Sequence, residues 1–337
     1  MRAIILVGGR GMRLRPLTIH TPKPIVPVLN QPLLLYQIKL LKRFGITDIC
    51  LSSFYLPQKL RDILGSGEQW GVQLKYVLEE FPLGTGGAAR NAFDHGSREA
   101  TIVFNGDILT CLDLAELLRF HQEKRSQATL VLTPVEDPTA YGLVETDSTG
   151  QIESFLEKPS EEEINTNNIS AGTYVFEPEV FDLIAAGQNV SFERETFPLL
   201  LKEGRPFYGF CSTSYWLDIG TPEKYLQANL DLIDQSGNWQ WAFAEEMFAP
   251  GGNLAVIGTN SQILSKAVYR SAIGANCKVA AGATVRSSVL WEDVVVEKNA
   301  EVKHSLIGRG CVIGERCRLR NVVLSDGTIL KEGSILY

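Results

Sequence analysis

The sequence predicts an α/β protein in two parts: a mostly parallel, doubly wound domain, then a left-handed parallel β-helix. Apolar strand-like runs alternate with helical patterns from residue 1 to about residue 235, which is typical of a parallel sheet with helices on both faces. From residue 263 onward, aliphatic residues recur every six positions, which is the period of hexapeptide repeats in a β-helix. An ordinary β-sandwich would show a period of two instead.

The elements of the first part follow from the apolar runs and from the residues that begin helices. Each predicted helix has Pro, Ser, Asp or Gly near its start. Ligands of such a sheet gather at the carboxyl ends of the strands, where Gly8 and Asp107 fall. Residues 142–155 are predicted to form a hairpin beside the main sheet. The predicted strands are residues 3–7, 47–52, 73–78, 101–105, 128–133 and 171–176, and the predicted helices are residues 32–44, 56–64, 87–93, 113–124, 191–202 and 222–234.

The second part follows a stretch rich in turn residues. Residues 236–262 include most of QSGN and all of PGGN, which mark a linker. Breaks of five, five and four residues in the later repeats are predicted corners of the coil. We expect this domain, residues 263–337, to serve oligomerisation or orientation rather than chemistry. The residues predicted to point inward are Ala267, Ile273, Val279, Val285, Leu290, Val296, Val302, Ile307, Ile313, Leu319, Val323, Ile329 and Ile335.

Composition excludes several classes of protein. The chain has 337 residues, 45% of them hydrophobic, enough for a large core. It has no apolar run of about 18 residues and no signal-like cleavage site, so we expect neither a membrane span nor a secretory signal. Six cysteines without a C-x-x-C pair indicate reduced thiols in a cytoplasmic protein. A net charge of -7 argues against nucleic acid as a partner.

A loop rich in glycine and arginine, GGRGMRLRPLT at residues 8–18, directly follows the first strand. Glycines let the backbone approach a polyanion, and arginines offer a fork of donors to phosphate oxygens. No acidic residue precedes Asp48, so this segment is wholly basic. The loop matches neither standard phosphate-binding pattern, and a plain glycine turn stays an alternative. Two prolines stiffen the backbone around Lys23, which adds a second candidate phosphate ligand.

Two aspartates are candidate metal ligands. Asp107 lies in NGD just past an apolar run, and Asp218 lies in WLDIGTP before a helix. Two carboxylates beside a triphosphate need a hard cation between them, and Mg²⁺ takes oxygen ligands of this kind. Taken alone, Asp107 is also consistent with a turn residue, and Asp218 with an acidic residue at the N-terminus of a helix.

Further candidates lie in two regions of the first part. LGTGG at residues 83–87 enters a helix just after Glu79 and Glu80, and a carboxylate there can pair with the adjacent donors of guanine, which adenine lacks. A solvated strand end is the alternative for either glutamate. EKP at residues 157–159 supplies an acid and a base. A solvated surface pair is the alternative for these two side chains. SAGTYVF at residues 170–176 offers small residues against which a sugar can pack.

In their order along the chain, GGxGxRLxPLT, PKP, LGTGG, NGD, EKP, SAGTYVF and WLDIGTP closely resemble the motifs of sugar-1-phosphate nucleotidyltransferases, and most of all those of mannose-1-phosphate guanylyltransferases. The resemblance covers residues 1 to about 233, and the hexapeptide repeats extend it to Tyr337. It implies a Rossmann-like, GT-A-like catalytic domain over residues 1–235. Met12 departs from the small Thr or Ser usual in the family, and we expect it to tune the nucleotide site.

The resemblance implies a reaction and a role for each candidate. The oxygen of a sugar-1-phosphate, favoured as mannose-1-phosphate, attacks the α-phosphorus of a nucleoside triphosphate, favoured as GTP, and gives pyrophosphate and a nucleoside diphosphate sugar, here GDP-mannose. Arg13 and Lys23 hold the triphosphate, Asp107 and Asp218 carry Mg²⁺, and Lys158 neutralises the sugar phosphate. The nucleotide-binding candidates are Leu6, Gly8, Gly9, Gly11, Glu79, Gly84 and Gly87. The sugar-phosphate candidates are Gly142, Glu157, Lys158, Ala171 and Gly172.

Other functions stay open at this point. The thymidylyl, uridylyl and adenylyl branches that act on glucose-1-phosphate share most of these motifs. A non-catalytic regulatory subunit is a further alternative, as is a hexapeptide-repeat acyltransferase that uses His304, the one histidine of the repeats. The expected partners are the two substrates and further copies of the chain, with neither nucleic acid nor a membrane.

Overall fold

The computed structural model describes residues 1–234 and 254–337, in two compact units. Unit 1 comprises Met1–Gly9 and Gln37–Trp216, and unit 2 comprises the described parts of Arg10–Tyr36 and Leu217–Tyr337. The segment that carries Arg13 and Lys23 therefore belongs to the same compact unit as the repeats. Within the two described ranges, no helix is long and apolar enough to cross a membrane.

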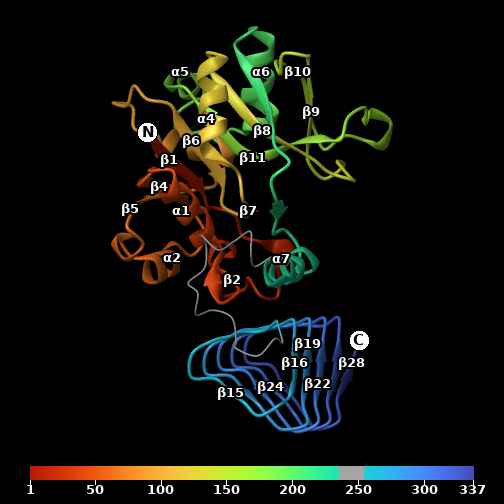
Figure 1. The fold of residues 1–337 in the computed structure, drawn as a ribbon. Coiled ribbons are helices and arrows are strands. Elements are labelled where there is room, and N and C mark those ends of the chain that lie inside the picture. The colour runs from red at the N-terminus through yellow and green to blue at the C-terminus, as the bar shows by residue number, and fades with distance from the viewer. Residues whose placement is uncertain (235–253) are drawn as a thin grey trace. The chain divides into compact units, whose positions relative to one another are not determined.

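Unit 1 is built on a nine-stranded sheet (Figure 1). Four strands run parallel side by side in the order β5 (Gln73–Leu78), β4 (Asp48–Ser53), β1 (Arg2–Leu6) and β6 (Thr101–Asn105). The next strand, β11 (Asn168–Phe176), is antiparallel to β6. The sheet is therefore mixed, because β11 reverses the direction of the strands. The other strands of this sheet are β8 (Ala128–Pro134), β9 (Gly142–Thr146), β10 (Ile152–Glu157) and β12 (Phe207–Cys211).

The predicted hairpin is confirmed, since β9 and β10 pair antiparallel. The short strands β7 (Ile108–Thr110), β12 and β13 (Trp216–Asp218) were not predicted, and β7 and β13 form a separate two-stranded sheet. The Tyr215 carbonyl beside that pair accepts hydrogen bonds from the Cys111 amide (3.1 Å) and the Thr110 hydroxyl (3.0 Å). Strands β7 and β13 have three residues each, too few to show a period, whereas β12 is as long as β1 and was simply missed.

The predicted helices all form, with ends that differ by up to three residues. The helix α4 (Leu114–Glu123) begins where Asp113 accepts hydrogen bonds from the amides of Ala115 and Glu116, as N-cap residues do. The predicted helix 191–202 is a π-helical turn, Phe192–Thr196, that continues into α6 (Phe197–Lys202). The other helices are α1 (Leu33–Arg43), α2 (Pro57–Leu64), α3 (Gly84–Ala92), α5 (Pro178–Asp182), which was not predicted, and α7 (Pro222–Asp234), and the short 3-10 turns are Met12–Leu14, Lys23–Ile25, Glu68–Trp70 and Glu161–Glu163.

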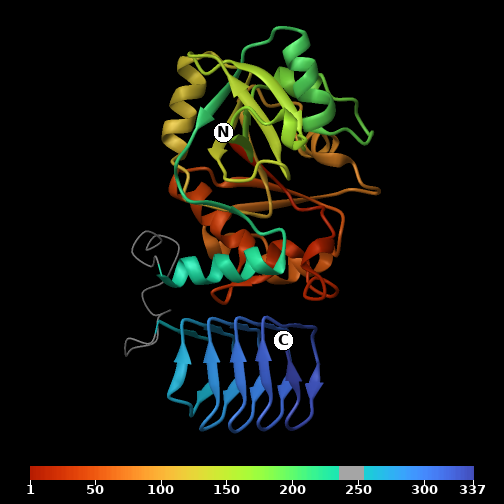
Figure 2. The same cartoon turned by 90° about the vertical axis from the view of Figure 1, so that its right-hand side faces the viewer.

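The repeats of unit 2 form the predicted left-handed parallel β-helix, whose coils stack in Figure 2. Three five-stranded parallel sheets make its three sides. The first is β14 (Val256–Ile257), β17 (Ala272–Ile273), β20 (Val289–Leu290), β23 (Leu306–Ile307) and β26 (Val323–Leu324). The second is β15 (Gln262–Ile263), β18 (Lys278–Val279), β21 (Val295–Val296), β24 (Val312–Ile313) and β27 (Ile329–Leu330). The third is β16 (Ala267–Tyr269), β19 (Thr284–Arg286), β22 (Glu301–Lys303), β25 (Arg318–Arg320) and β28 (Ile335–Leu336).

The inward residues match the prediction in the middle coils and are shifted by one at both ends. Ala267 is exposed and Val268 is buried in its place, and Leu324 is buried rather than Val323. Strand β27 likewise turns Leu330 to the core, with Ile329 72% exposed, and Ile335 is also exposed. The registers explain the shift, because each middle coil takes 17 residues, in steps of six, six and five. The two predicted corners of five residues are therefore right, whereas the step from Ala267 to Ile273, predicted as six, and the step from Leu319 to Val323, predicted as four, are both five in the structure, from Val268 and to Leu324. A slip of one residue exchanges the two faces of a strand.

The β-helix begins inside the predicted linker. Residues 236–253 of that linker lie outside the described residues, but β14 and β15 already pair with the next coil. The first repeat is 16 residues rather than 17, since Val256 pairs with Ala272. This irregular first coil does not follow the six-residue count, which explains why its strands were missed.

In unit 2 the first side of the β-helix is bound to α7 and to the segment before α1. The Nε1–H group of Trp291 donates to the Tyr225 hydroxyl (3.0 Å), which donates to the Pro27 carbonyl. The side chain of Asn30 donates to the Ile273 carbonyl (2.7 Å). Trp291 and Tyr225 are 1% and 0% exposed, so these hydrogen bonds are shielded from water. The coil thereby supports the segment that carries Lys23.

We predict that Trp291→Phe lowers the free energy of unfolding by about 1 to 2 kcal/mol, because the substitution removes a buried hydrogen-bond donor and leaves the Tyr225 hydroxyl without it. Urea denaturation followed by far-UV circular dichroism measures the loss. Trp70→Phe is the matched control, since the buried Nε1 of Trp70 has no hydrogen-bond partner among the described residues. Equal destabilisation by both substitutions would show that the bulk of the indole ring, and not its hydrogen bond to Tyr225, stabilises the protein.

Candidate active site

The carboxyl ends of β1 and β6 bring two of the predicted motifs together in unit 1. The strands are parallel with Leu6 opposite Asn105, so Gly8 and Asp107 each lie two residues beyond a paired position. The Gly106 amide donates to the Leu6 carbonyl (2.9 Å). A side chain at Gly106 would place Cβ 2.6 Å from Val7 Cγ1. Gly106 is therefore required for the close approach of the two loops.

Glu79 lies beside Gly8, whereas Glu80 does not share its surroundings. Glu79 is 9% exposed and accepts hydrogen bonds from the Ser52 hydroxyl and from the Leu83 amide (both 3.1 Å). A Cβ at Gly8 would lie 2.9 Å from Oε1 of Glu79. Glu80 is exposed. Of the two glutamates predicted to read the base, only Glu79 is held in a defined position by the protein.

The glycines of the LGTGG turn make close backbone contacts with residues 188–190. Gly84 has a φ of +71°, and a Cβ there would lie 2.5 Å from the Val190 carbonyl oxygen. A Cβ at Gly87 would overlap the Gln188 carbonyl. The amides of Gly86 and Gly87 both donate to the Val190 carbonyl. The structure thus explains these glycines by packing, and their contact with a nucleotide stays a prediction.

The sugar-side candidates Gly142 and Glu157 lie opposite each other in the β9–β10 hairpin. The Phe155 ring occupies the space that a side chain at Gly142 would need. Lys158 follows with a φ of +54°, and its amide donates to the Tyr141 carbonyl (2.8 Å). The Lys158 side chain is 61% exposed, with Nζ 3.9 Å from Oε1 of Glu157. The hairpin therefore presents a cation and a half-buried acid together.

The other sugar-side candidates, Ala171 and Gly172, form an irregularity in β11. The register against β8 shifts between Ser170 and Tyr174. Gly172 has a φ of +65°, and a Cβ there would lie 2.7 Å from Nδ2 of Asn105. This bulge therefore packs against the strand end that precedes Asp107. The predicted sugar-side and metal residues of unit 1 are neighbours, joined through Asn105.

Two aromatic residues near this bulge were not among the predicted site residues. The Nε1–H group of Trp216 donates to the Ala171 carbonyl (2.8 Å), and the ring meets that of Tyr141 edge to face at 5.6 Å. Tyr141 directly precedes Gly142. A sequence signal was available for Trp216, because it lies in the WLDIGTP motif.

Unit 2 holds the basic loop and its lysine together. Gly11 has a φ of +59°, and a Cβ there would lie 3.1 Å from Cβ of Lys23 and 3.2 Å from Cγ2 of Thr18. The Thr18 hydroxyl donates to the Gly11 carbonyl (2.7 Å). Lys23 is 8% exposed, whereas Arg13 is exposed. The two predicted phosphate ligands therefore belong to one folded segment, and their binding of phosphate stays a prediction.

Asp218 forms a second cluster of charges in unit 2. Lys224, in the first turn of α7, forms an ion pair with Asp218, whose side chain is 14% exposed. A Cβ at Gly220 would lie 2.9 Å from Oδ2 of Asp218 and 3.0 Å from Nη2 of Arg13. Arg13, Asp218 and Lys224 are thus neighbours. Lys224 was not predicted, although a lysine in the first turn of a helix opposes the helix dipole and was a signal in the sequence.

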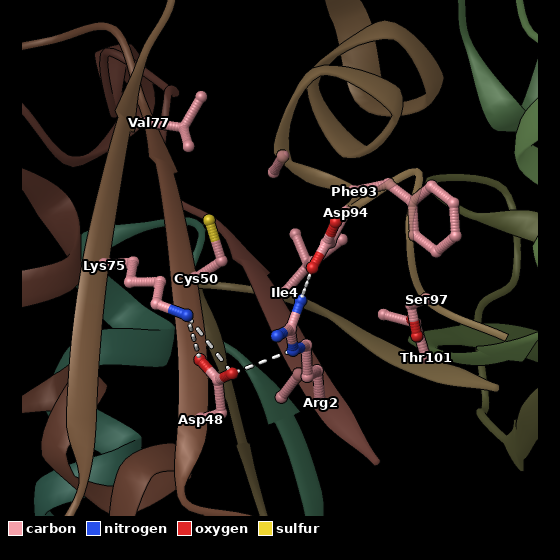
Figure 3. Close-up of a pocket in the computed structure, with 12 residues that line it drawn as sticks. Arg2, Ile4, Asp48, Cys50, Lys75, Val77, Phe93, Asp94, Ser97 and Thr101 are labelled. Atoms are coloured by element: carbon pink, nitrogen blue, oxygen red, sulfur yellow. Dashed lines mark hydrogen bonds and ion pairs between the residues drawn. The ribbon is translucent and has the colours of Figure 1, made fainter. Parts of the chain in front are cut away.

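A separate hollow of about 200 Å³ lies at the opposite, amino-terminal edge of the sheet in unit 1 (Figure 3). Its charged residues neutralise one another: Asp48 lies between Arg2 (2.8 Å) and Lys75 (3.1 Å), and Arg2 also pairs with Asp94. Burial raises the pKa of the Cys50 thiol to about 11, so this cysteine is a poor nucleophile near neutral pH. Because its charges are satisfied, this hollow is not the candidate active site.

Comparison with known proteins agrees with this arrangement. The family model described as "Nucleotidyl transferase" matches residues 2–235, and "GMPPB C-terminal domain" matches residues 252–336. The chain belongs to the nucleotidyl transferase family. It is 38% identical to "Mannose-1-phosphate guanylyltransferase" of Mycobacterium tuberculosis over 99% of this chain and 82% of that protein. It is 36% identical to "Mannose-1-phosphate guanyltransferase" of Debaryomyces hansenii over 98% of this chain and 92% of that protein.

A solved structure also resembles this nucleotidyl transferase. HddC from Yersinia pseudotuberculosis, complexed with GMP-PN, superposes with a TM-score of 0.59 at 29% identity. The match covers 68% of this chain and 97% of HddC. Its extent is close to that of the family model for the first part of the chain.

The oxygen ligands of this nucleotidyl transferase suit a divalent cation that is shared with substrate. Asp107 belongs to unit 1 and Asp218 to unit 2, and both offer carboxylate oxygens. Among the residues that the structure describes, no group of three or more His, Cys, Asp and Glu side chains could enclose a metal ion. Mg²⁺ commonly takes one or two carboxylates and completes its shell with water and phosphate oxygens. Each carboxylate therefore offers oxygen donors of the kind that a divalent cation takes, and their shared binding of Mg²⁺ stays a prediction.

We predict that Glu157→Gln makes the stability of this nucleotidyl transferase less dependent on pH. Burial, followed by the charge of Glu193, raises the pKa of Glu157. A raised pKa means that the folded state binds the proton more tightly than the unfolded state, so the contribution of Glu157 to stability falls as pH rises from its ordinary pKa to the raised one. Thermal midpoints from about pH 4 to about pH 7 should fall less in the variant than in the wild type. Glu153→Gln, at an exposed position of the same strand, is the control and should keep the wild-type slope.

Proposed function

We propose that the chain transfers a guanylyl group from GTP to mannose-1-phosphate, which forms GDP-mannose and releases pyrophosphate. One observation carries this proposal: two relatives named for this activity, from Mycobacterium tuberculosis and Debaryomyces hansenii, align with 99% and 98% of the chain. The alignment therefore includes the β-helix as well as the loops at the strand ends. The charged clusters described above suit substrates that are both phosphorylated.

In the proposed reaction, an oxygen of mannose-1-phosphate attacks the α-phosphorus of GTP as the bond to the pyrophosphate oxygen breaks. Arg13 and Lys23 bind the triphosphate and neutralise the departing pyrophosphate. Lys158 binds the phosphate of the sugar, so that two anions can approach each other. No covalent intermediate on the protein is needed, and its contribution is positioning and neutralisation of charge.

Asp107 and Asp218 are the proposed ligands of Mg²⁺, which when bound supplies positive charge at the α-phosphate. Lys224 orients the carboxylate of Asp218 through their ion pair. Arg13 lies on the other side of Gly220, so the Asp218 carboxylate can orient the Arg13 guanidinium. In the proposal this guanidinium contacts the triphosphate. This makes Lys224 a positioning residue in the proposal.

The sugar and the base are assigned to different sets of residues. Gly142, Glu157, Ala171 and Gly172 form the proposed sugar site, where Glu157 accepts hydrogen bonds from hydroxyl groups. Leu6, Gly8, Gly9 and Glu79 form the proposed base site, with Gly11 from the basic loop and with Gly84 and Gly87 acting through the backbone. Glu79 is the proposed reader of guanine, because its buried carboxylate adjoins Gly8.

We also propose that the protein acts in the cytoplasm as a homo-oligomer. All six cysteines are free thiols in the structure, which suits a reducing compartment. The exposed end of the β-helix, with Tyr337 81% exposed, offers a surface for association with further copies. Neither nucleic acid nor a membrane is a proposed partner.

We predict that Asp107→Asn and Asp218→Asn each lower kcat by orders of magnitude, because each removes a carboxylate charge from the proposed cation site. The double variant should lose little more than the worse single variant, since groups that act as a unit are not additive. Steady-state pyrophosphate release with varied Mg²⁺ measures both effects. Asp113→Asn, at a helix N-cap that is not among the proposed site residues, is the control. Near-normal turnover of either site variant would contradict its assignment.

We predict that GTP with mannose-1-phosphate gives the highest kcat/KM in a matrix of GTP, ATP, UTP and dTTP against mannose-1-phosphate and glucose-1-phosphate. Glu79→Gln should narrow the preference for GTP by roughly tenfold to a hundredfold, because an unpaired polar group costs ~1 to 3 kcal/mol. Glu80→Gln is the matched control, since Glu80 is exposed, and it should keep the preference. A wild-type preference for another triphosphate would overturn the guanine assignment and leave nucleotidyl transfer standing.

A further inference from the structure

The outer faces of the β-helix differ sharply in character. On the first side, the outward residues Ala272, Val289 and Leu306 are 1%, 1% and 2% exposed, because this side is bound to the rest of unit 2. On the third side, made by β16, β19, β22, β25 and β28, the outward residues include Arg286, Lys303 and Arg320. One side of the coil is thus apolar and covered, and another is cationic.

The cations of the third side form a continuous column. Tyr269 pairs with Arg286, Arg286 with Lys303, and Lys303 with Arg320 in successive parallel strands. Neighbouring strands lie about 4.8 Å apart, so the stems of these side chains are held close together. Like charges directly opposite each other destabilise a sheet. A chain of net charge -7 therefore concentrates positive charge where the fold makes it unfavourable.

A second column borders the first at the corner of the coil. Arg270, Ser287 and His304 occupy equivalent corner positions with φ of 47°, 48° and 48°. Together the two columns line a hollow of about 530 Å³, which we call the cationic groove, and none of the described residues that line it is acidic. The size of the groove leaves room for a ligand of several phosphate groups.

Internal partners neutralise only part of this charge. Arg270 pairs with Asp234 at 2.9 Å, and Lys303 pairs with Glu301 at 2.6 Å. The guanidinium of Arg286 lies over the Tyr269 ring at 5.8 Å, which leaves its charge uncompensated. Within the described ranges, no ion pair involves Arg286 or Arg320. Two guanidinium groups flanking a lysine thus remain to bind an anion.

We propose that the cationic groove binds an oligophosphate, a linear chain of two or more phosphate groups that is either free or part of a nucleotide. Guanidinium groups bind phosphate oxygens through paired donors, and a row of cations matches a row of anionic groups. The Tyr269 ring, 41% exposed at one end of the column, gives a nucleotide base a surface to stack on. The site lies wholly on the β-helix and uses none of the residues assigned to nucleotidyl transfer.

Equilibrium dialysis of the full chain with labelled tripolyphosphate tests the proposal, and Arg13→Gln distinguishes the groove from the catalytic nucleotide site. The wild type should show a binding event that persists in Arg13→Gln and weakens at least tenfold in Arg286→Gln/Arg320→Gln. The matched control is Arg309→Gln/Arg316→Gln, because these arginines lie on the same β-helix and each pairs with a carboxylate. The control should bind as the wild type does. Loss of all tripolyphosphate binding in Arg13→Gln, or equal binding by the two double variants, would overturn the proposal.

Thermal denaturation gives an independent readout. Without ligand, Arg286→Gln/Arg320→Gln should melt at or above the wild-type temperature, because it relieves repulsion within the column. Tripolyphosphate should raise the midpoint of Arg13→Gln and should not raise that of the triple variant Arg13→Gln/Arg286→Gln/Arg320→Gln. GTP binding the groove at least tenfold more tightly than tripolyphosphate would identify the nucleotide form, and the reverse order would identify the free form. A lower midpoint of the groove variant without ligand would show that the arginines serve the fold, which contradicts the proposal.

Discussion

The register between β1 and β6 is the constraint on which the candidate site of unit 1 depends. With Leu6 opposite Asn105, the loops that carry Gly8 and Asp107 leave the sheet side by side. The same Asn105 touches the bulge at Gly172, so the sugar-side residues are placed by the strand that places the aspartate. Glycines occur where the backbones come closest, and a single Cβ at Gly106 would force two strand ends apart. Packing of the backbone thus sets the positions of the charged groups.

Unit 2 organises its charges in a different way. The 17-residue coil repeats the same three sides, so a residue type placed once per coil becomes a column. The inward column makes the core, and the outward column of the first side is buried against α7 and the segment around Asn30. Because this segment continues from Lys23 within one unit, the stability of the coil and the position of the phosphate ligands are physically connected. This connection goes beyond the oligomerisation or orientation expected from the repeats.

Two acidic side chains, Asp218 in unit 2 and Glu157 in unit 1, have different surroundings. Asp218 pairs with Lys224 and lies near Arg13, so its carboxylate is held in one orientation. Glu157 is instead partly removed from water and lies near Glu193, and burial first and that charge second raise its pKa. A carboxylate of raised pKa is a stronger hydrogen-bond acceptor and pairs well with the hydroxyl groups of a sugar. The contrast between these two acids follows from their neighbours and not from their residue type.

Local patterns in the sequence were sufficient for the order of the strands and helices, for the β-helix and for the family. Alternation and six-residue spacing arise from residues adjacent in the chain, and the motifs of the family are short and continuous. The tertiary structure decided which distant residues meet: Lys224 with Asp218, Trp291 with Tyr225, and Gly84 with Val190. It also decided that Val268 and Leu330, and not Ala267 and Ile329, face the core of the coil. The physical reason is that pairing register and side-chain contacts depend on segments far apart in the chain, whose approach no local spacing encodes.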